Sequence, residues 1–194
     1  MNPTRLILAS ASPQRQRLLR EAGYDFLTHP AEVDESSLTR NLAPADAALR
    51  IAGAKAQAVA GKFPDDVVLA ADTVVALGGM ILGKPADAAD ARRILAQLSG
   101  TTHQVITGVA VIHIRSALSL IEQVISTVEM KPLTPDEIDA YIASNQWQGK
   151  AGAYGIQDPD PFVRRTAGCV TNIVGLPMTT TRRLLGRAGI VPLG

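Results

Sequence analysis

An uninterrupted apolar run, Val67–Ala71, constrains the fold more than any other segment of the sequence. Apolar residues without alternation are typical of a strand that is covered on both faces. Such a strand requires helices on both sides of a sheet, and the rest of the chain alternates strand-like and helix-like patterns. We therefore expect an α/β fold, organised as one domain over residues 1–194, with a candidate smaller lobe around residues 130–150.

The expected elements follow one another through short connections marked by Pro and Gly. Helices are expected after Ser12-Pro13, after Pro44, and over Ala86–Ser99, Pro135–Asn145 and Thr179–Gly186. Strands are expected near Leu6–Ala9, Tyr24–His29, Val67–Ala71, Val74–Leu77, Met80–Leu82, Thr102–Ile114, Leu118–Met130 and Val170–Val174. Gly78-Gly79 is a hairpin signal, and the acidic segment 32–35 is expected to be a loop.

Composition excludes several classes of protein. The 19 Lys and Arg residues nearly balance the 18 Asp and Glu residues, for a formal net charge of +1. A surface that wraps polymeric nucleic acid needs a larger basic excess, and the aromatic content of 4% is low for base-stacking platforms. A small anionic ligand remains compatible, because a local cluster of cations does not change the total.

The same sequence argues against a disulfide scaffold and a membrane span. Cys169 is the single cysteine and has no His nearby, so we expect it to be a small buried residue. No window approaches 18 consecutive apolar residues. The apolar run at Leu6–Ala11 is too short for a signal peptide. We expect a cytoplasmic protein that does not bind membranes.

The segment Ser10–Arg15 lies between an expected strand and the start of a helix. Free backbone N–H groups at a helix N-terminus favour an anion, and the Ser10 and Ser12 hydroxyls with Arg15 would add donors to phosphate. An ordinary helix cap with an exposed arginine is the simpler interpretation of this segment taken alone.

Asp72 follows the buried run and is expected at the carboxyl end of that strand. Open α/β sheets place ligand-binding groups at such ends, where an Asp can hold a divalent metal or act as a base. An Asp that starts a turn is an equally good interpretation.

Other charged residues are weaker candidates. Lys55 and Lys84 could neutralise phosphate, although solvated lysines are the more common case. Glu32, Asp34 and Glu35 could supply metal oxygens, although most acidic loops are simply solvated. The residues alone thus favour a phosphate-bearing small molecule over a peptide or a lipid.

Eight segments in order resemble the Maf family of nucleoside triphosphate pyrophosphatases, over nearly the whole chain. They are Leu6–Pro13, Val33-Asp34-Glu35, Ala54-Lys55-Ala56, Ala71-Asp72-Thr73, Gly83-Lys84-Pro85, Leu98-Ser99-Gly100, Lys150–Gln157 and Val174–Pro177. Any one of these motifs is weak evidence, whereas their common order is specific.

The resemblance implies a Maf/ITPase-like fold with a cleft along a central mixed twisted sheet, and a homodimer. It implies hydrolysis of a nucleoside triphosphate to the monophosphate and pyrophosphate with Mg²⁺ or Mn²⁺. Asp72 matches the proton acceptor of the family, and Glu35 and Asp72 match its metal side. The positions that match phosphate binding are Ser10, Ser12, Arg15, Lys55 and Lys84.

Base selection is implied by three further positions. Thr73 and Gln157 match the subgroup that acts on dTTP and UTP, and a Gln amide offers both a donor and an acceptor to a pyrimidine edge. Gln14 departs from the Arg of that subgroup, which removes a fixed charge. The segments Asp158–Pro161 and Gly168–Val170 also depart from the usual pattern.

Two other functions stay open from the sequence. One is a nucleotide-binding regulator of cell division or septum formation with little hydrolysis, against which intact Asp72, Lys55 and Lys84 argue. The other is a methylated-GTP pyrophosphatase, which Thr73 and Gln157 disfavour.

Overall fold

The computed structural model describes residues 4–159 and 162–193, and within them seven strands form one mixed sheet. The strand order is β2-β1-β3-β5-β6-β7, and β4 pairs with β3. The strands are β1 (Leu6–Leu8), β2 (Leu27–Thr28), β3 (Val67–Leu77), β4 (Met80–Leu82), β5 (Thr102–His113), β6 (Leu118–Met130) and β7 (Val163–Ala167). β1 is parallel to β2 and β3, whereas the other pairs are antiparallel. The expected α/β class with a mixed sheet is confirmed.

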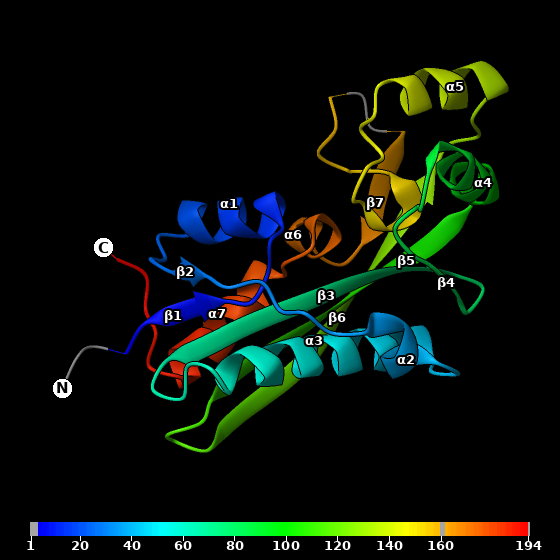
Figure 1. Ribbon diagram of the computed structural model, residues 1–194. Helices are drawn as coiled ribbons and strands as arrows, with labels where there is room; N and C mark the ends of the chain where they lie inside the picture. Colours follow the sequence, from blue (N-terminus) through cyan, green and yellow to red (C-terminus); the bar gives the residue numbers. More distant parts are fainter. Residues whose placement is uncertain (1–3, 160–161, 194) are drawn as a thin grey trace.

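Helices cover both faces of this sheet (Figure 1). They are α1 (Pro13–Glu21), α2 (Glu35–Thr39), α3 (Pro44–Ala60), α4 (Ala88–Leu98), α5 (Pro135–Ala143), the 3₁₀ turn η1 (Ala151–Ala153), α6 (Val170–Val174) and α7 (Met178–Arg187). None of the helices in the described part of the chain combines the length and apolar character needed to cross a membrane.

The long helix α3 lies along one face of the sheet, against β3 and β5 (Figure 1). Its small residues allow a very close approach: a Cβ atom added to Gly108 of β5 would lie 2.3 Å from the backbone oxygen of Ala48 on α3. Any side chain larger than hydrogen at Gly108 would therefore push the helix away from the sheet. This close packing sets how near α3 lies to β5.

The opposite face carries two separate apolar clusters. The first joins α1 and α7 to β1, β3 and β5, through buried residues such as Leu19 and Leu184. The second joins α4, α5 and η1 to the far ends of β3, β5 and β6, through residues such as Leu95 and Trp147. Because each cluster holds a different end of the sheet, the strip of β3 between them is free to face a ligand.

The same strip of β3 is also unpaired along one edge. β1 pairs with Val67–Leu69 and β4 pairs with Val75–Leu77, both on the edge away from β5. No strand of the described chain pairs with the intervening residues 70–74 on this edge. The gap lies immediately beyond the carboxyl end of β1, where open sheets accept ligands.

Several expected elements are wrong in detail. Asp72 is not at the end of its strand, since β3 continues without interruption to Leu77 and absorbs the separate strand expected at Val74–Leu77. The expectation fails because the antiparallel ladder with β5 continues past Asp72, from Val68 to Ala76, and keeps the backbone extended. The hairpin at Gly78-Gly79 is confirmed, with φ values of 57° and 85° that suit glycine.

The segment expected as a last strand is the short helix α6, Val170–Val174. Its β-branched residues favour a strand, but the fully buried Asn172 donates hydrogen bonds to Val105 O and Ser126 Oγ and so ties this turn to the sheet. Tertiary contacts thus override the local preference. Strand β7 (Val163–Ala167) had no expected counterpart.

Candidate active site

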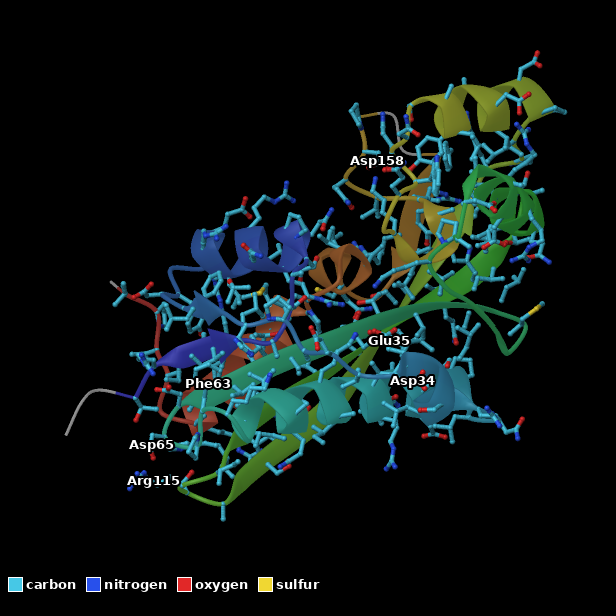
Figure 2. All side chains as sticks on the ribbon, in the orientation of Figure 1. Asp34, Glu35, Phe63, Asp65, Arg115 and Asp158 are labelled. Carbon is cyan, nitrogen blue, oxygen red and sulfur yellow. The ribbon has the colours of Figure 1, made fainter. Side chains whose placement is uncertain are left out.

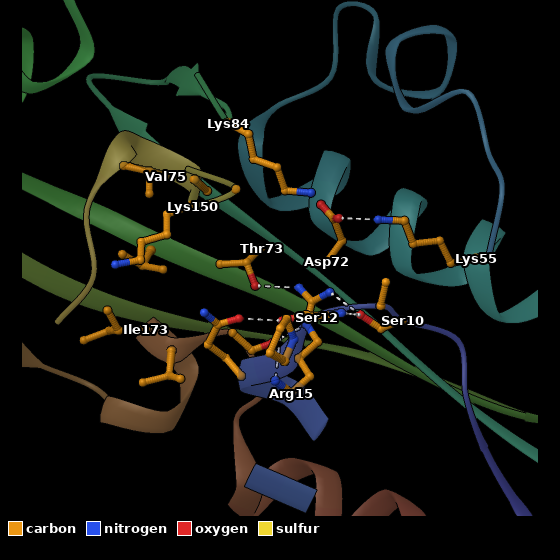
Figure 3. Close-up of a pocket in the computed structure, with 18 of the residues that line it drawn as sticks. Ser10, Ser12, Arg15, Lys55, Asp72, Thr73, Val75, Lys84, Lys150 and Ile173 are labelled. Carbon is orange, nitrogen blue, oxygen red and sulfur yellow. Dashed lines mark hydrogen bonds and ion pairs between the residues drawn. The ribbon is translucent and has the colours of Figure 1, made fainter. Parts of the chain in front are cut away.

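A cavity of about 520 Å³ opens over the gap in the edge of β3. It falls within the size range of small-molecule sites. The ten residues that the family resemblance assigned to catalysis, phosphate, metal or base all line it: Ser10, Ser12, Gln14, Arg15, Glu35, Lys55, Asp72, Thr73, Lys84 and Gln157. Seven of them, Ser10, Ser12, Arg15, Lys55, Asp72, Thr73 and Lys84, are labelled in Figure 3. The structure therefore brings together residues from both ends and the middle of the chain.

Asp72 and Lys55 form a buried ion pair at the centre of the cavity. Lys55 Nζ lies 2.7 Å from Asp72 Oδ1 (Figure 3). It also lies 2.6 Å from Glu35 Oε1, so two carboxylates share one ammonium group. Lys55 projects from α3, and Glu35 is the first residue of α2. Asp34 caps α2 by accepting hydrogen bonds from the backbone N–H groups of Ser36 and Ser37.

Burial tends to raise the pKa of both carboxylates and the neighbouring cations tend to lower it, but the net shift is upward for Asp72 and downward for Glu35. Burial raises the pKa of Asp72, the neighbouring charges of Lys55 and Arg15 lower it in part, and Glu35 raises it further. Burial also acts to raise the pKa of Glu35, but its hydrogen bond to Lys55 and the charges of Lys55, Lys84 and Arg15 outweigh that effect and lower it. Asp72 is thus the more basic of the two groups.

Arg15 is held in place by three acceptors. Its Nε donates to Gly175 O at 2.8 Å, its Nη1 to Ser10 Oγ at 3.2 Å and its Nη2 to Thr73 Oγ1 at 3.1 Å. Burial lowers the pKa of Arg15, and the charges of Asp72 and Glu35 offset part of this. Of the two interpretations of the Ser10–Arg15 segment, the exposed arginine is wrong, because the guanidinium forms part of the cavity wall.

A polar chain behind Arg15 was not found from the sequence. Thr73 Oγ1 and Thr107 Oγ1 are 3.0 Å apart, and Thr107 Oγ1 donates to the backbone oxygen of Asn172 at 3.1 Å. Thr107 and Asn172 are fully buried. A Thr alternating with apolar residues in a strand gives no sign of such a role, so only the fold reveals it.

The first turn of α1 brings backbone and hydroxyl donors to the same wall. Ser12 is the N-cap of α1, and its hydroxyl donates to Gln14 Oε1 at 3.1 Å. Ser10 Oγ accepts a hydrogen bond from the Ser12 backbone N–H at 3.2 Å. The expected cap with Pro13 at the start of the helix is confirmed.

Positive charge exceeds negative charge around the cavity. Two further cations line it, Lys84 after β4 and Lys150 before η1. The backbone N–H of Gly152 donates to Gly83 O at 3.0 Å, which joins these two segments across the cavity mouth. With Arg15 and Lys55, four cationic side chains face the two carboxylates. This charge pattern suits a polyphosphate rather than an uncharged ligand.

The described residues provide no complete cage for a metal ion, since no group of three or more His, Cys, Asp and Glu side chains gathers there. Glu35 and Asp72, however, already converge on one cation, the Lys55 ammonium. Mg²⁺ is commonly held by one or two carboxylates together with oxygens of a bound phosphate. The donor set is therefore compatible with a metal that arrives with a phosphorylated ligand.

Some candidates lie outside this centre. Glu32 does not line the cavity, and Asp34 serves as the cap of α2. Cys169 is partly exposed rather than fully buried, and it precedes α6. Of the departing segment Asp158–Pro161, Asp160 and Pro161 lie outside the described residues.

Fold and site together define an α/β protein with a cation-lined cleft, in which the buried Asp72–Lys55 pair is joined by the partly exposed Glu35. The Maf-like protein family model matches residues 5–188, and the chain belongs to this family. The expected family is confirmed.

Proteins named dTTP/UTP pyrophosphatase are similar to this chain over almost their whole length. The one from Anaeromyxobacter dehalogenans (strain 2CP-C) is 48% identical over 188 residues, which cover 95% of this chain and 94% of that protein. The one from Syntrophomonas wolfei is 45% identical, covering 94% and 96%. The one from Pyrococcus furiosus is 42% identical, covering 93% and 94%.

Among solved structures, the Staphylococcus aureus Ham1 protein matches 66% of this chain and 72% of its own, with 16% identity and a TM-score of 0.47. A HAM1 protein from Coxiella burnetii matches 66% and 73%, with 18% identity and a TM-score of 0.44.

Proposed function

We propose that this protein is a hydrolase that converts dTTP and UTP to the monophosphate and pyrophosphate. The observation that carries the proposal is the buried Asp72, which shares the Lys55 ammonium with Glu35 inside a cavity lined by four cations. Relatives of 42–48% identity along nearly the whole chain, named dTTP/UTP pyrophosphatase, support it. We treat residues 5–188, the span of the family match, as one catalytic unit.

The triphosphate is bound by the cations and by the first turn of α1. Arg15 is already oriented by Gly175, Ser10 and Thr73, so little conformational entropy is lost when it contacts phosphate. Lys55 and Lys84 supply point charges from α3 and from the loop after β4. Backbone N–H groups beside Ser10 and Ser12 add donors at the helix N-terminus.

Asp72 accepts a proton from the attacking water. Burial raises the pKa of this carboxyl, which makes it a better proton acceptor than an exposed Asp. Attack at the α-phosphorus forms the new P–O bond and breaks the bond to the β-phosphate oxygen, so pyrophosphate leaves and the monophosphate stays. Lys55, within 2.7 Å of Asp72, stabilises the carboxylate form between cycles.

Glu35 and Asp72 would hold a divalent metal, Mg²⁺ or Mn²⁺, in place of the contacts that they make to Lys55. When bound, this metal would offset charge on the phosphate oxygens. Lys55 would then be free to move toward a phosphate. We also propose a cytoplasmic location, since the substrates are present there.

Base selection is assigned to Thr73, Gln157 and Gln14. The Gln157 amide lines the cavity and can both donate to and accept from the imide edge of thymine or uracil. Gln14 accepts a hydrogen bond from the Ser12 hydroxyl, and Thr73 accepts one from Arg15. Both side chains are therefore held in the wall of the cavity.

The test is a panel of canonical and modified nucleoside triphosphates with Mg²⁺ or Mn²⁺, in which pyrophosphate and orthophosphate are measured separately. We expect pyrophosphate, with dTTP and UTP preferred over dCTP and over purine substrates. Orthophosphate as the product would contradict the proposed reaction. Equal turnover of purines and pyrimidines would contradict the base preference.

A further inference from the structure

We propose that Asp158 is a positioning residue that sets base selectivity by fixing the turn that carries Gln157. The inference rests on the proposed function, because it assumes that Gln157 contacts the base. It concerns a residue outside the cavity lining, at the α5 end of the molecule (Figure 2).

The Asp158 carboxylate closes a tight turn. Its Oδ2 accepts the backbone N–H of Gly155 at 3.0 Å, while its own backbone N–H donates to Gly155 O at 3.2 Å. Gln157 therefore sits inside a loop whose two ends are tied to each other twice. Removing the carboxylate would leave one of these two ties and an unpaired N–H on the buried Gly155.

The same carboxylate ties this turn to two other elements. Tyr141 of α5 donates its hydroxyl to Asp158 Oδ2 at 2.6 Å, and Lys150 forms an ion pair with Asp158 Oδ1. The Asp158 side chain is only 9% exposed and that of Lys150 16%, so the pair is shielded from water. Removing one partner of such a pair costs more than breaking a surface ion pair, because it leaves a largely buried charge without a partner.

The Gln157 side chain, in contrast to that of Asp158, is not held by hydrogen bonds to other described residues. Among the described residues its side-chain amide forms no hydrogen bond, and it is exposed at the cavity. Its direction is therefore set by the backbone of the turn. A Cβ atom built on Gly155 would lie 2.7 Å from Asp158 Oδ1, 2.8 Å from Gln157 Nε2 and 2.9 Å from Lys150 Nζ. The side chains of Asp158, Gln157 and Lys150 thus meet above Gly155. A shift of Asp158 would change the space that the Gln157 side chain can occupy.

The consequence is a selective effect on the base. A loosened turn lets Gln157 adopt several orientations, so the amide no longer distinguishes an imide edge from the amino edge of cytosine. The proposed phosphate-binding residues Ser10, Ser12, Arg15, Lys55 and Lys84 lie at the start of α1, on α3 and on the loop after β4, and none of them is a partner of the Asp158 side chain. They should therefore keep their positions. Selectivity should therefore fall more than turnover.

The experiment compares Asp158→Ala, Asp158→Asn and Tyr141→Phe with the wild type. The control is Asp139→Asn, which removes an α5 carboxylate that pairs with Arg92 away from the cavity. The readout is the ratio of kcat/KM for dTTP to that for dCTP, with pyrophosphate as the measured product. We expect Asp158→Ala to reduce this ratio about tenfold, Asp158→Asn and Tyr141→Phe to reduce it less, and Asp139→Asn to leave it unchanged.

An equal fall for both substrates, or an unchanged ratio in Asp158→Ala, would overturn the inference. If the wild type releases no pyrophosphate from any substrate, the proposed function fails instead. Amide hydrogen exchange then tests whether Asp158 holds the turn. Faster exchange at residues 155 and 158 in Asp158→Ala would support that role, and unchanged exchange would reject it.

Discussion

Asp72 and Thr73 are neighbours on β3, and their side chains point to opposite faces of the sheet. Asp72 pairs with Lys55 on α3, whereas Thr73 accepts a hydrogen bond from Arg15 on α1. Alternation along a strand requires this separation. The cavity reaches both side chains because the edge of β3 has no partner strand there among the described residues. One strand therefore presents the proposed base, Asp72, on one face and the residue that anchors Arg15, Thr73, on the other.

Asp72→Asn tests the assignment of the base. The amide keeps the size of the side chain but cannot accept a proton, so we expect kcat to fall about 10²- to 10³-fold. The midpoint of thermal unfolding should change by no more than a few degrees. Asp66→Asn is the matched control, since Asp66 is equally buried but lies just before β3 and pairs with Arg5. Full activity of Asp72→Asn would show that another group takes the proton.

The pH dependence of kcat/KM should have an acid limb set by Asp72. Burial raises the pKa of this group, so the active carboxylate is lost as pH falls, at a higher pH than for an ordinary Asp. Lys55→Met removes a charge that lowers this pKa, so we expect the Asp72 pKa to rise further. Carboxyl ¹³C NMR can follow the titration even if Lys55→Met is inactive. A downward shift would contradict the described ion pair.

Arg15→Lys tests the fixed guanidinium. Lysine carries the same charge but cannot contact Gly175, Ser10 and Thr73 at once. We expect kcat/KM to fall about 10- to 100-fold, at the level of one or two charge-assisted hydrogen bonds. Arg17→Lys on the exposed side of α1, where Arg17 pairs only with Glu21 among the described residues, should have no effect. Steady-state kinetics of the two variants distinguish geometry from charge.

Gly108→Ala tests the close contact of α3 with β5. The new methyl group would meet the Ala48 backbone at 2.3 Å, so we expect a loss of about 1–3 kcal/mol in the free energy of unfolding. Gly186→Ala is the control, because a Cβ there meets nothing within 4 Å in helix α7. That variant should gain up to about 1 kcal/mol. Urea unfolding measures both, and equal stabilities would argue against the close packing.

Because His103 is buried, we expect the folded protein to lose stability in mild acid. This buried residue contacts the Tyr154 hydroxyl at 2.6 Å through Nε2, and its Nδ1 has no partner within the described structure. Burial lowers the pKa of His103 to about 4, below the ordinary value of about 6.5. The unfolded chain thus takes up a proton before the folded one, and stability falls as pH drops from about 6.5 to about 4.

The size of this effect is about 3 kcal/mol at most, from the difference between the two pKa values. His103→Gln keeps a polar group near Tyr154 but does not titrate, so its stability should be flatter over the same pH range. Thermal unfolding at several pH values measures the difference. Parallel curves for the two proteins would contradict the buried neutral imidazole.

Only part of the site could be predicted from local patterns. Ser12 and Pro13 mark a helix start, which is confirmed. Asp72 follows a buried run and stands in one of the family motifs, so it could be named as a site residue, but its expected place at the end of the strand was wrong. The supporting contacts could not be predicted. Thr107 and Asn172 meet across long sequence separations, and neither occupies a position with a local signal.

The same reason explains the errors in the fold. Val170–Val174 has the composition of a strand, but whether it joins a sheet depends on where the sheet has a free edge. The Lys150–Asp158 pair was also missed, since residues eight apart in a Gly-rich segment have no fixed relation until the turn is formed.

The unpaired stretch of β3 also bears on how this chain avoids aggregation. Exposed strand edges are templates on which another molecule can add a strand, and proteins commonly protect them with charge. Here the open backbone is short and recessed, and Arg15, Lys55 and Lys84 surround it. A second strand would have to bury those charges to pair. The cations proposed to bind a triphosphate would thus also hinder neighbouring molecules from joining their sheets at this point.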